Sequence, residues 1–158
     1  MIVTDEIWTE EEAPTWPQSA HPKRVLVAED DAAMRDLLLL VLRERGYAVD
    51  CVSSGSQMIS VLSERRADGS LAQRFDLIVT DVRMPGASGL DAIDQMRRAG
   101  GLTPVIAVTA FPHDSTRNRA QRLEIRLLAK PFDLDTLRDA VEAALDSTLA
   151  PRSEERQP

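Results

Sequence analysis

Cysteine, aromatic residues and long apolar segments are all scarce in this chain of 158 residues. The single cysteine, Cys51, excludes an internal disulfide and fits a reducing compartment, and its place in an expected strand assigns it to the core. No stretch is long and apolar enough to cross a membrane. Residues 1–22 lack the basic and apolar regions of a signal peptide. We therefore expect a cytoplasmic protein with no membrane partner.

Several functional classes are disfavoured by what else is missing. There is no glycine-rich loop that ends in Lys-Ser or Lys-Thr, and neither His21 nor His113 has the spacing of a metal ligand. The formal net charge is -7, so the chain as a whole would repel the phosphate backbone of a nucleic acid. With 43% hydrophobic but only 4% aromatic residues, the core must consist mainly of Val, Leu, Ile and Ala.

The length suits one domain with tails, and composition divides the chain into three parts. We predict an acidic disordered leader at residues 1–22, a folded domain at 23–149 and a polar C-terminal tail at 150–158. The leader holds three consecutive glutamates and both tryptophans, Trp8 and Trp16. Two interpretations stay open for it: a flexible acidic segment, or a docking peptide whose tryptophans anchor to a partner or to the domain itself.

Within the folded part, short apolar runs alternate with segments whose apolar residues recur at helical spacing. Near-continuous apolar strands separated by helices are typical of a parallel sheet buried on both faces. We predict an α/β fold, a doubly wound five-stranded parallel sheet flanked by five helices. The expected strands are Val25–Ala28, Tyr47–Val52, Leu77–Thr80, Val105–Val108 and Arg126–Ala129.

Polar side chains follow the expected strands at the points where the strands end. They are Glu29, Asp30 and Asp31 after the first strand, Asp81 after the third, Thr109 after the fourth and Lys130 after the fifth. Because ligands of open parallel sheets sit at the carboxyl ends of the strands, we expect these groups to gather there. Asp31 alone is better explained as a helix cap.

Carboxylates that share a small space repel one another, and a hard divalent cation such as Mg²⁺ relieves the repulsion. Lys130 adds a mobile positive charge and Thr109 a hydroxyl donor for a phosphoryl oxygen. An aspartate nucleophile with a metal, a lysine and a hydroxyl makes a phosphoryl-transfer site with an aspartyl-phosphate intermediate.

On these residues the chain resembles the receiver domain of response regulators, a CheY-like family with a flavodoxin-like fold, and in particular its single-domain type. The resemblance covers roughly residues 23–149. Its motifs, each weak alone but specific in this order, are Val25-Leu26-Val27-Ala28-Glu29-Asp30, Asp81-Val82-Arg83-Met84-Pro85-Gly86 with Gly89-Leu90, Val108-Thr109-Ala110 and Lys130-Pro131-Phe132.

The resemblance implies a role for each site residue. Asp81 is the phospho-acceptor, and Glu29 and Asp30 hold Mg²⁺ together with Asp81 and the backbone carbonyl of Arg83. Thr109 is the hydroxyl that turns toward the phosphoryl group. Ala110 is small enough to leave access to the site. Lys130 pairs with Asp81 and later with the phosphoryl group, and the Lys130–Pro131 peptide is expected to be cis.

Ala110, Phe111 and Leu127 are expected to modulate this pattern. Leu127 stands where the family usually has an aromatic switch residue, so another packing change must report the phosphate. Arg83 and Phe111 flank the phosphate in this family and are expected to tune its hydrolysis. Phe111 either shields the phosphoryl group sterically or is an ordinary exposed aromatic.

Two further segments are distinguished by their polar composition. The arginines at positions 117, 119, 122 and 126 form either a solvated basic face or a dock for an acidic partner, the leader included. The polar stretch 65–74 is longer than the family usually has, and we expect it to bulge on the side away from the site.

We predict a two-component response regulator that accepts a phosphoryl group from a sensor histidine kinase or a phosphotransfer protein. It would pass its state to an unidentified downstream protein, with a phosphorylation-dependent dimer as one form. It is not an enzyme beyond its own phosphotransfer and autodephosphorylation. Because the chain ends soon after the fifth helix, we expect no direct nucleic-acid binding. The alternative is a phosphate sink or phosphorelay intermediate, whose own dephosphorylation is the function.

Overall fold

The computed structural model describes residues 21–147. Residues 1–20 and 148–158, with most of the expected leader, both tryptophans and the whole expected tail, lie outside the described residues. Every helix among residues 21–147 is too short or too polar to cross a bilayer.

Five parallel strands form one sheet in the order β2-β1-β3-β4-β5, the order of flavodoxin-like folds. The predicted fold class is confirmed. The strands are β1 (Arg24–Ala28), β2 (Ala48–Val52), β3 (Leu77–Asp81), β4 (Val105–Thr109) and β5 (Ile125–Ala129). Each expected strand therefore exists, with ends that differ from the prediction by one residue at most.

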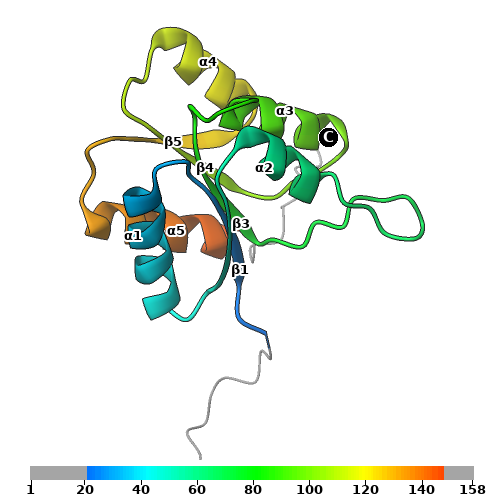
Figure 1. Cartoon of the computed structure of the whole chain (residues 1–158), viewed down its shortest axis with the longest axis horizontal. Helices are drawn as coiled ribbons and strands as arrows, with labels where there is room; N and C mark the ends of the chain where they lie inside the picture. Colours follow the sequence, from blue (N-terminus) through cyan, green and yellow to red (C-terminus); the bar gives the residue numbers. More distant parts are fainter. Residues whose placement is uncertain (1–20, 148–158) are drawn as a thin grey trace, which may run out of the picture.

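Helices cover both faces of this sheet, as Figure 1 shows: α1 and α5 lie on one side, and α2, α3 and α4 on the other. The helices are α1 (Ala32–Glu44), α2 (Gly55–Leu62), α3 (Gly89–Arg98), α4 (Asp114–Arg122) and α5 (Leu134–Ser147). Alternate residues of a strand face opposite layers. Val25 and Val27 accordingly pack against α1 and α5, whereas Leu26 and Ala28 face the opposite layer.

Polar caps fix where several helices begin. The side chains of Asp31, Ser54 and Ser88 each accept a hydrogen bond from a backbone N–H in the first turn of α1, α2 and α3. Asp133 does the same for the N–H of Thr136 at the start of α5. The interpretation of Asp31 as a cap is confirmed, which removes it from the group of carboxylates available for chemistry.

The stretch between α2 and β3 projects from the body of the domain, at the right of Figure 1. It folds back on itself through a bridge between Arg65 and Leu71, and it enters β3 at the amino end, away from the carboxyl ends of the strands. Sequence polarity hid one feature: Leu71 is buried in the core under α2 and α3, and Phe75 joins it there.

Cys51 corrects the sequence-based assignment to the core, because its side chain is exposed. Its strand, β2, is an edge strand that pairs only with β1. Side chains near the end of an edge strand receive less cover than those of the inner strands. A strand assignment therefore did not entail burial at this position.

Candidate functional site

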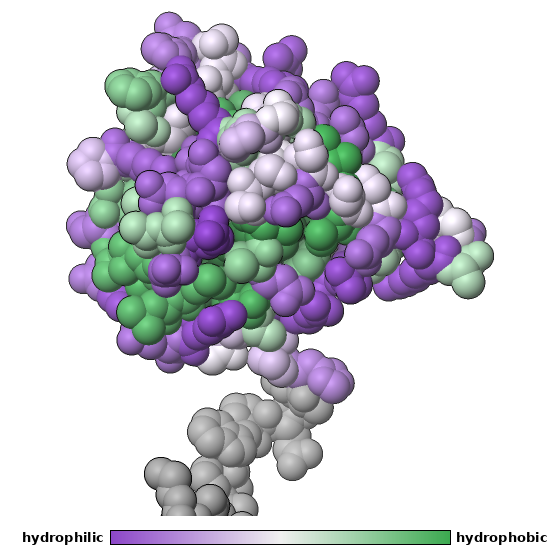
Figure 2. Space-filling view, in the orientation of Figure 1, coloured by the Kyte–Doolittle hydropathy of each residue, from purple (hydrophilic) through white to green (hydrophobic). Residues whose placement is uncertain are grey.

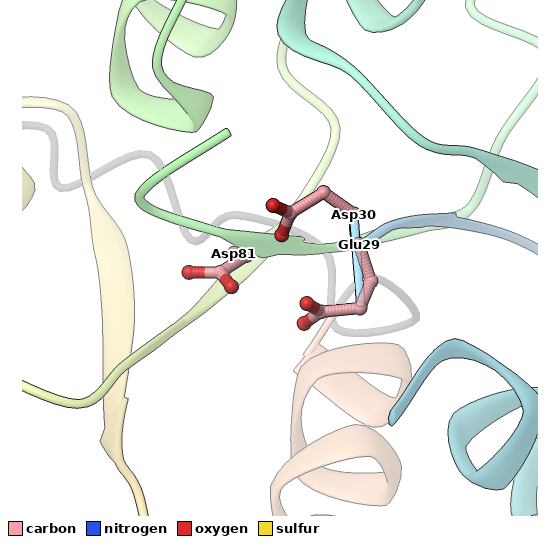
Figure 3. A group of neighbouring side chains, drawn as sticks. All are labelled: Glu29, Asp30 and Asp81. Atoms are coloured by element: carbon pink, nitrogen blue, oxygen red, sulfur yellow. The ribbon is translucent and has the colours of Figure 1, made fainter. Parts of the chain in front are cut away.

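Three carboxylates meet at the adjoining ends of β1 and β3. Glu29 and Asp30 follow β1, and Asp81 is the last residue of β3 (Figure 3). One oxygen of each lies within 4.8 Å of the others. Glu29 is buried, Asp81 is half-buried and Asp30 is exposed. The group is therefore open to solvent on one side only.

Lys130 joins the group from the end of β5. Its backbone N–H donates to the carbonyl of Thr109 at 2.8 Å, which extends the pairing of β4 with β5 up to the site. The Lys130 Nζ lies 3.1 Å from Asp81 Oδ2 and 3.4 Å from Glu29 Oε2. The Lys130–Pro131 peptide is cis, as expected. One ammonium group thus pairs with two of the three carboxylates.

The site shifts the pKa values of Glu29 and Lys130. Burial, and secondly the charge of Asp81, raises the pKa of Glu29 to about 7. Burial opposes the charged form of Lys130, but its hydrogen bond to Asp81 and the charges of Asp81 and Glu29 outweigh this and raise its pKa. Burial and the charge of Asp81 together outweigh the attraction of the one ammonium group, so Glu29 holds a proton over part of the neutral range.

Close packing of α3 fixes the backbone beneath the acceptor position. The Gly89 N–H donates to the carbonyl of Val82 at 3.0 Å. A Cβ at position 89 would collide with the carbonyl oxygen of Asp81 and come within 2.6 Å of Thr80 Oγ1. Buried Thr80 donates to that same Asp81 carbonyl at 2.8 Å. Only glycine lets α3 begin this close to the strand end.

On the open side, two side chains named from the sequence contact each other. The guanidinium carbon of Arg83 lies 5.8 Å from the centre of the Phe111 ring, within cation–π range. The Arg83 N–H donates to Asp81 Oδ1 at 3.1 Å. The Phe111 N–H donates to the hydroxyl of Thr109 at 3.3 Å. Both members of the pair are thus attached, through their backbones, to site residues.

The residues predicted from sequence fall into two groups. Glu29, Asp30, Asp81 and Lys130 are brought together directly. The remaining ones border the site or lie near it: Thr109, buried at the end of β4; Ala110 and Phe111, exposed just beyond it; Arg83, on the loop after β3; and Leu127, half-buried beneath α3 and α4.

Sequence reasoning missed Arg35 altogether, and it named Arg119 only as part of a basic cluster and not for its pairing with α3. Arg35, on the first turns of α1, donates to the backbone carbonyl of Glu29 at 3.0 Å. Arg119, on α4, pairs with Asp91 of α3 at 2.7 Å. Helical spacing gave no signal for either, because their partners lie on other elements or in a loop.

The basic cluster expected around α4 does not form one face. Arg119 turns to α3 and Arg117 donates to the carbonyl of Pro112. Ile125 belongs to the core beneath α3 and α4, whereas Leu128 belongs to the opposite core. Alternation along β5 therefore places Arg126 on the side away from α4. A dock formed by all four arginines finds no support.

The carboxylate group has the right chemistry for Mg²⁺. The ion prefers oxygen ligands at about 2.0–2.1 Å, so opposite ligands lie about 4.2 Å apart. The three oxygens lie within 4.8 Å of one another, and neighbouring ligands of an octahedral ion lie closer together than opposite ones, so the side chains must move inward to bind the ion. A bound divalent cation would also offset both causes of the raised pKa of Glu29, which are burial and then repulsion by Asp81.

Comparison with known families agrees with this arrangement. The family model described as the response regulator receiver domain matches residues 25–142, most of the chain. The chain therefore belongs to the response regulator receiver domain family, whose members accept a phosphoryl group in two-component signalling.

Among curated proteins, the chain is similar to the alkaline phosphatase synthesis transcriptional regulatory protein SphR of Synechococcus elongatus, at 36% identity over 73% of this chain and 46% of SphR. It is 37% identical to the response regulator protein PmrA of Pseudomonas aeruginosa, over 76% of this chain and 51% of PmrA. The chain thus spans about half the length of these relatives.

Among solved structures, the chain is similar to the receiver domain of a sensor histidine kinase from Pseudomonas aeruginosa. The two share 26% identity and a TM-score of 0.67, over 80% of this chain and 99% of the other. That structure is described as having a magnesium ion coordinated in its active site cleft.

Proposed function

We propose that Asp81 is the phospho-acceptor of this receiver domain, and that Glu29, Asp30 and the Arg83 carbonyl join it in holding Mg²⁺. The observation that carries the proposal is the convergence of Asp81, Glu29 and Lys130, from the ends of three strands, within hydrogen-bonding distance of one ammonium group. A merely structural set of caps would not bring a lysine between two carboxylates.

In the proposed reaction, an Asp81 carboxylate oxygen attacks the phosphorus of a phosphohistidine in line with the P–N bond. The P–N bond breaks, and the imidazole leaves with its electron pair and takes up a proton from solvent. Lys130 balances the charge that develops on the phosphoryl oxygens. When bound, Mg²⁺ supplies further neutralisation of these oxygens. The Thr109 hydroxyl can turn from the Phe111 N–H to donate to the product.

The direct test is to locate the phosphoryl group. The full chain is incubated with Mg²⁺ and a small acyl phosphate, then reduced with borohydride, which converts an aspartyl phosphate to homoserine. We expect the mass change at position 81 and no label without a divalent cation. Modification of another residue would contradict the assignment of Asp81, and no modification at all would contradict the function.

Helix α1 begins at this site and carries an apolar surface farther along its length. Asp31 caps α1 directly after the metal-binding pair, and Leu37 and Leu40 lie exposed farther along the helix. Figure 2 shows a hydrophobic patch over this region, at the lower left. We assign this surface to the protein that donates the phosphoryl group, because it must approach Asp81 from the open side.

Substitution of Leu40 by glutamine is expected to slow transfer from a protein donor about tenfold, which corresponds to about 1.4 kcal/mol of lost apolar burial. The donor is a phosphorylated histidine protein that labels the wild type, and kcat/KM is measured. The matched control is Leu102→Gln, because Leu102 is similarly exposed but precedes β4 at the far end of the sheet. Labelling by a small acyl phosphate should stay unchanged in both variants; equal kcat/KM values for the protein donor would rule out the α1 surface.

We also assign the Arg83–Phe111 pair a role in protecting the phosphoryl group from water. Substitution of Phe111 by alanine should shorten the phosphoryl lifetime about two- to fivefold, the equivalent of 0.5–1 kcal/mol for an exposed cation–π contact. Decay of the label is followed in purified protein without a partner. Phe111→Leu, which keeps apolar bulk but not the ring, separates steric cover from the cation–π contact. If Phe111→Ala leaves the phosphoryl lifetime unchanged, Phe111 is an ordinary exposed aromatic residue and does not shield the phosphoryl group.

A further inference from the structure

Helix α4 is the helix least held by apolar packing. Ala120 is its only buried residue, whereas α3 buries five. The preceding residue, His113, makes no side-chain cap to the helix. Elements with few buried apolar contacts open and shift at the lowest free-energy cost. The position of α4 therefore depends strongly on its polar attachments.

Two arginines supply those attachments, both between α3 and α4. Arg97, near the end of α3, donates to the carbonyl of Leu123 just after α4, and also to the carbonyls of Gly101 and Thr103. Arg119, on α4, donates to Asp91 Oδ1 at 2.7 Å and lies 3.8 Å from Asp94 Oδ2. Arg97 binds only backbone carbonyls far from the site, which makes it a fixed anchor. Arg119 reaches the opposite end of α3.

Asp91 has a second function there. Its Oδ2 accepts from the Ser88 N–H at 3.2 Å, and its own N–H donates to Ser88 Oγ at 3.1 Å, which forms a capping box. Ser88 is the end of the loop that leaves Asp81. Together with the close contact between Gly89 and the Asp81 carbonyl, this box ties the start of α3 to the acceptor strand.

We propose that the ion pair between Arg119 and Asp91 transmits the state of the Asp81 site to helix α4. The proposal rests on the proposed function and specifies its regulation. One oxygen of Asp91 holds the end of the loop after Asp81, and the other holds α4. A shift of that loop therefore changes the geometry offered to Arg119.

The charges and packing of the region agree with this role. The hydrogen bond from Arg119, more than any other interaction, holds the pKa of Asp91 below its usual value, so the carboxylate stays charged. A phosphoryl group would add a charge of about -1.5 to -2 beside the loop that carries Arg83. Leu127, which packs beneath α3 and α4, has no polar group with which to report that change. The ion pair supplies a polar connection in its place.

The test measures amide hydrogen exchange of α4 in the full chain, with Mg²⁺ alone and with Mg²⁺ plus beryllofluoride as the phosphoryl mimic. We expect beryllofluoride to change the exchange rates of the wild-type helix about two- to fivefold, the range of a partly exposed ion pair. In Arg119→Gln the rates should rise by a similar factor without the mimic and then no longer respond to it. Arg119→Lys should restore part of the response.

Arg122→Gln is the matched control, because it removes the same charge from the same helix and Arg122 makes no ion pair among residues 21–147. Asp91→Asn is the second variant, since the amide oxygen can still accept from Ser88 while the charge is lost. It should behave as Arg119→Gln does. A wild-type response retained in Arg119→Gln, or lost equally in Arg122→Gln, would overturn the proposal.

Labelling by an acyl phosphate separates this proposal from the one on which it rests. We expect every variant to take up the label as the wild type does, because none of the substituted residues touches the acceptor carboxylate. A wild type that takes no label refutes the proposed function. A labelled wild type whose α4 responds without Arg119 refutes the ion-pair connection alone.

Discussion

Substitution of Asp81 by asparagine is expected to abolish phosphoryl uptake completely. The amide carries no anionic oxygen to attack phosphorus, and it removes the negative charge that faces Lys130 at 3.1 Å. It also replaces one of the three carboxylates available to a cation by a neutral amide. Label from a small acyl phosphate should fall to background, whereas Asp50→Asn, at an exposed aspartate on the edge strand, should label as the wild type does.

The fold should tolerate this change. Asp81 raises the pKa of Glu29, so its charge is a source of repulsion in the metal-free protein. We expect the free energy of unfolding of Asp81→Asn to equal or exceed that of the wild type without Mg²⁺. An asparagine variant that still carries an acid-labile, hydroxylamine-sensitive phosphate would disprove the assignment of the acceptor.

The fold could be predicted closely because its determinants are local. Apolar runs as short as Val105–Val108, flanked by turns and helical segments, allow few arrangements besides a parallel sheet. Burial at the edges could not be predicted in the same way. Cys51 is exposed because its strand has one neighbour, and Leu71 is buried because a projecting loop folds back over α2 and α3. Both outcomes depend on the position of the element in the assembled sheet.

The site, like the fold, has features that the sequence predicts and features that only tertiary packing sets. Glu29, Asp81 and Lys130 could be placed together from sequence, because parallel strands bring their carboxyl ends to one edge. The ion pair between Arg119 and Asp91 could not, since it joins two helices whose facing sides are set by tertiary packing. The four arginines near α4 illustrate the converse: they are close in sequence, but Arg119 turns to α3 and Arg126 lies on the opposite face of β5.

The raised pKa of Glu29 gives the site a pH dependence of definite sign. Mg²⁺ needs the carboxylate form, and Glu29 has a pKa of about 7 in the metal-free fold. We expect Mg²⁺ to bind about tenfold more weakly at pH 6 than at pH 8, since only about one molecule in ten is deprotonated at the lower pH. Calorimetry or fluorescence titration at both pH values measures the ratio.

Glu29 also makes the stability of the metal-free fold depend on pH. This stability falls as the pH rises, whereas Mg²⁺ binding strengthens. Because its pKa in the fold exceeds its ordinary value of 4.5, the folded metal-free protein binds more protons than the unfolded chain between about pH 4.5 and 7. The contribution of Glu29 to stability is therefore complete below pH 4.5 and is lost as the pH rises to 7, whereas Mg²⁺ restores stability above that pH. Glu29→Gln should flatten the pH dependence of stability and the pH dependence of Mg²⁺ binding. It should also weaken Mg²⁺ binding at every pH. If the variant kept the wild-type pH dependence of Mg²⁺ binding, the titrating group would be another carboxylate, and Glu29 would not be the proton-linked ligand.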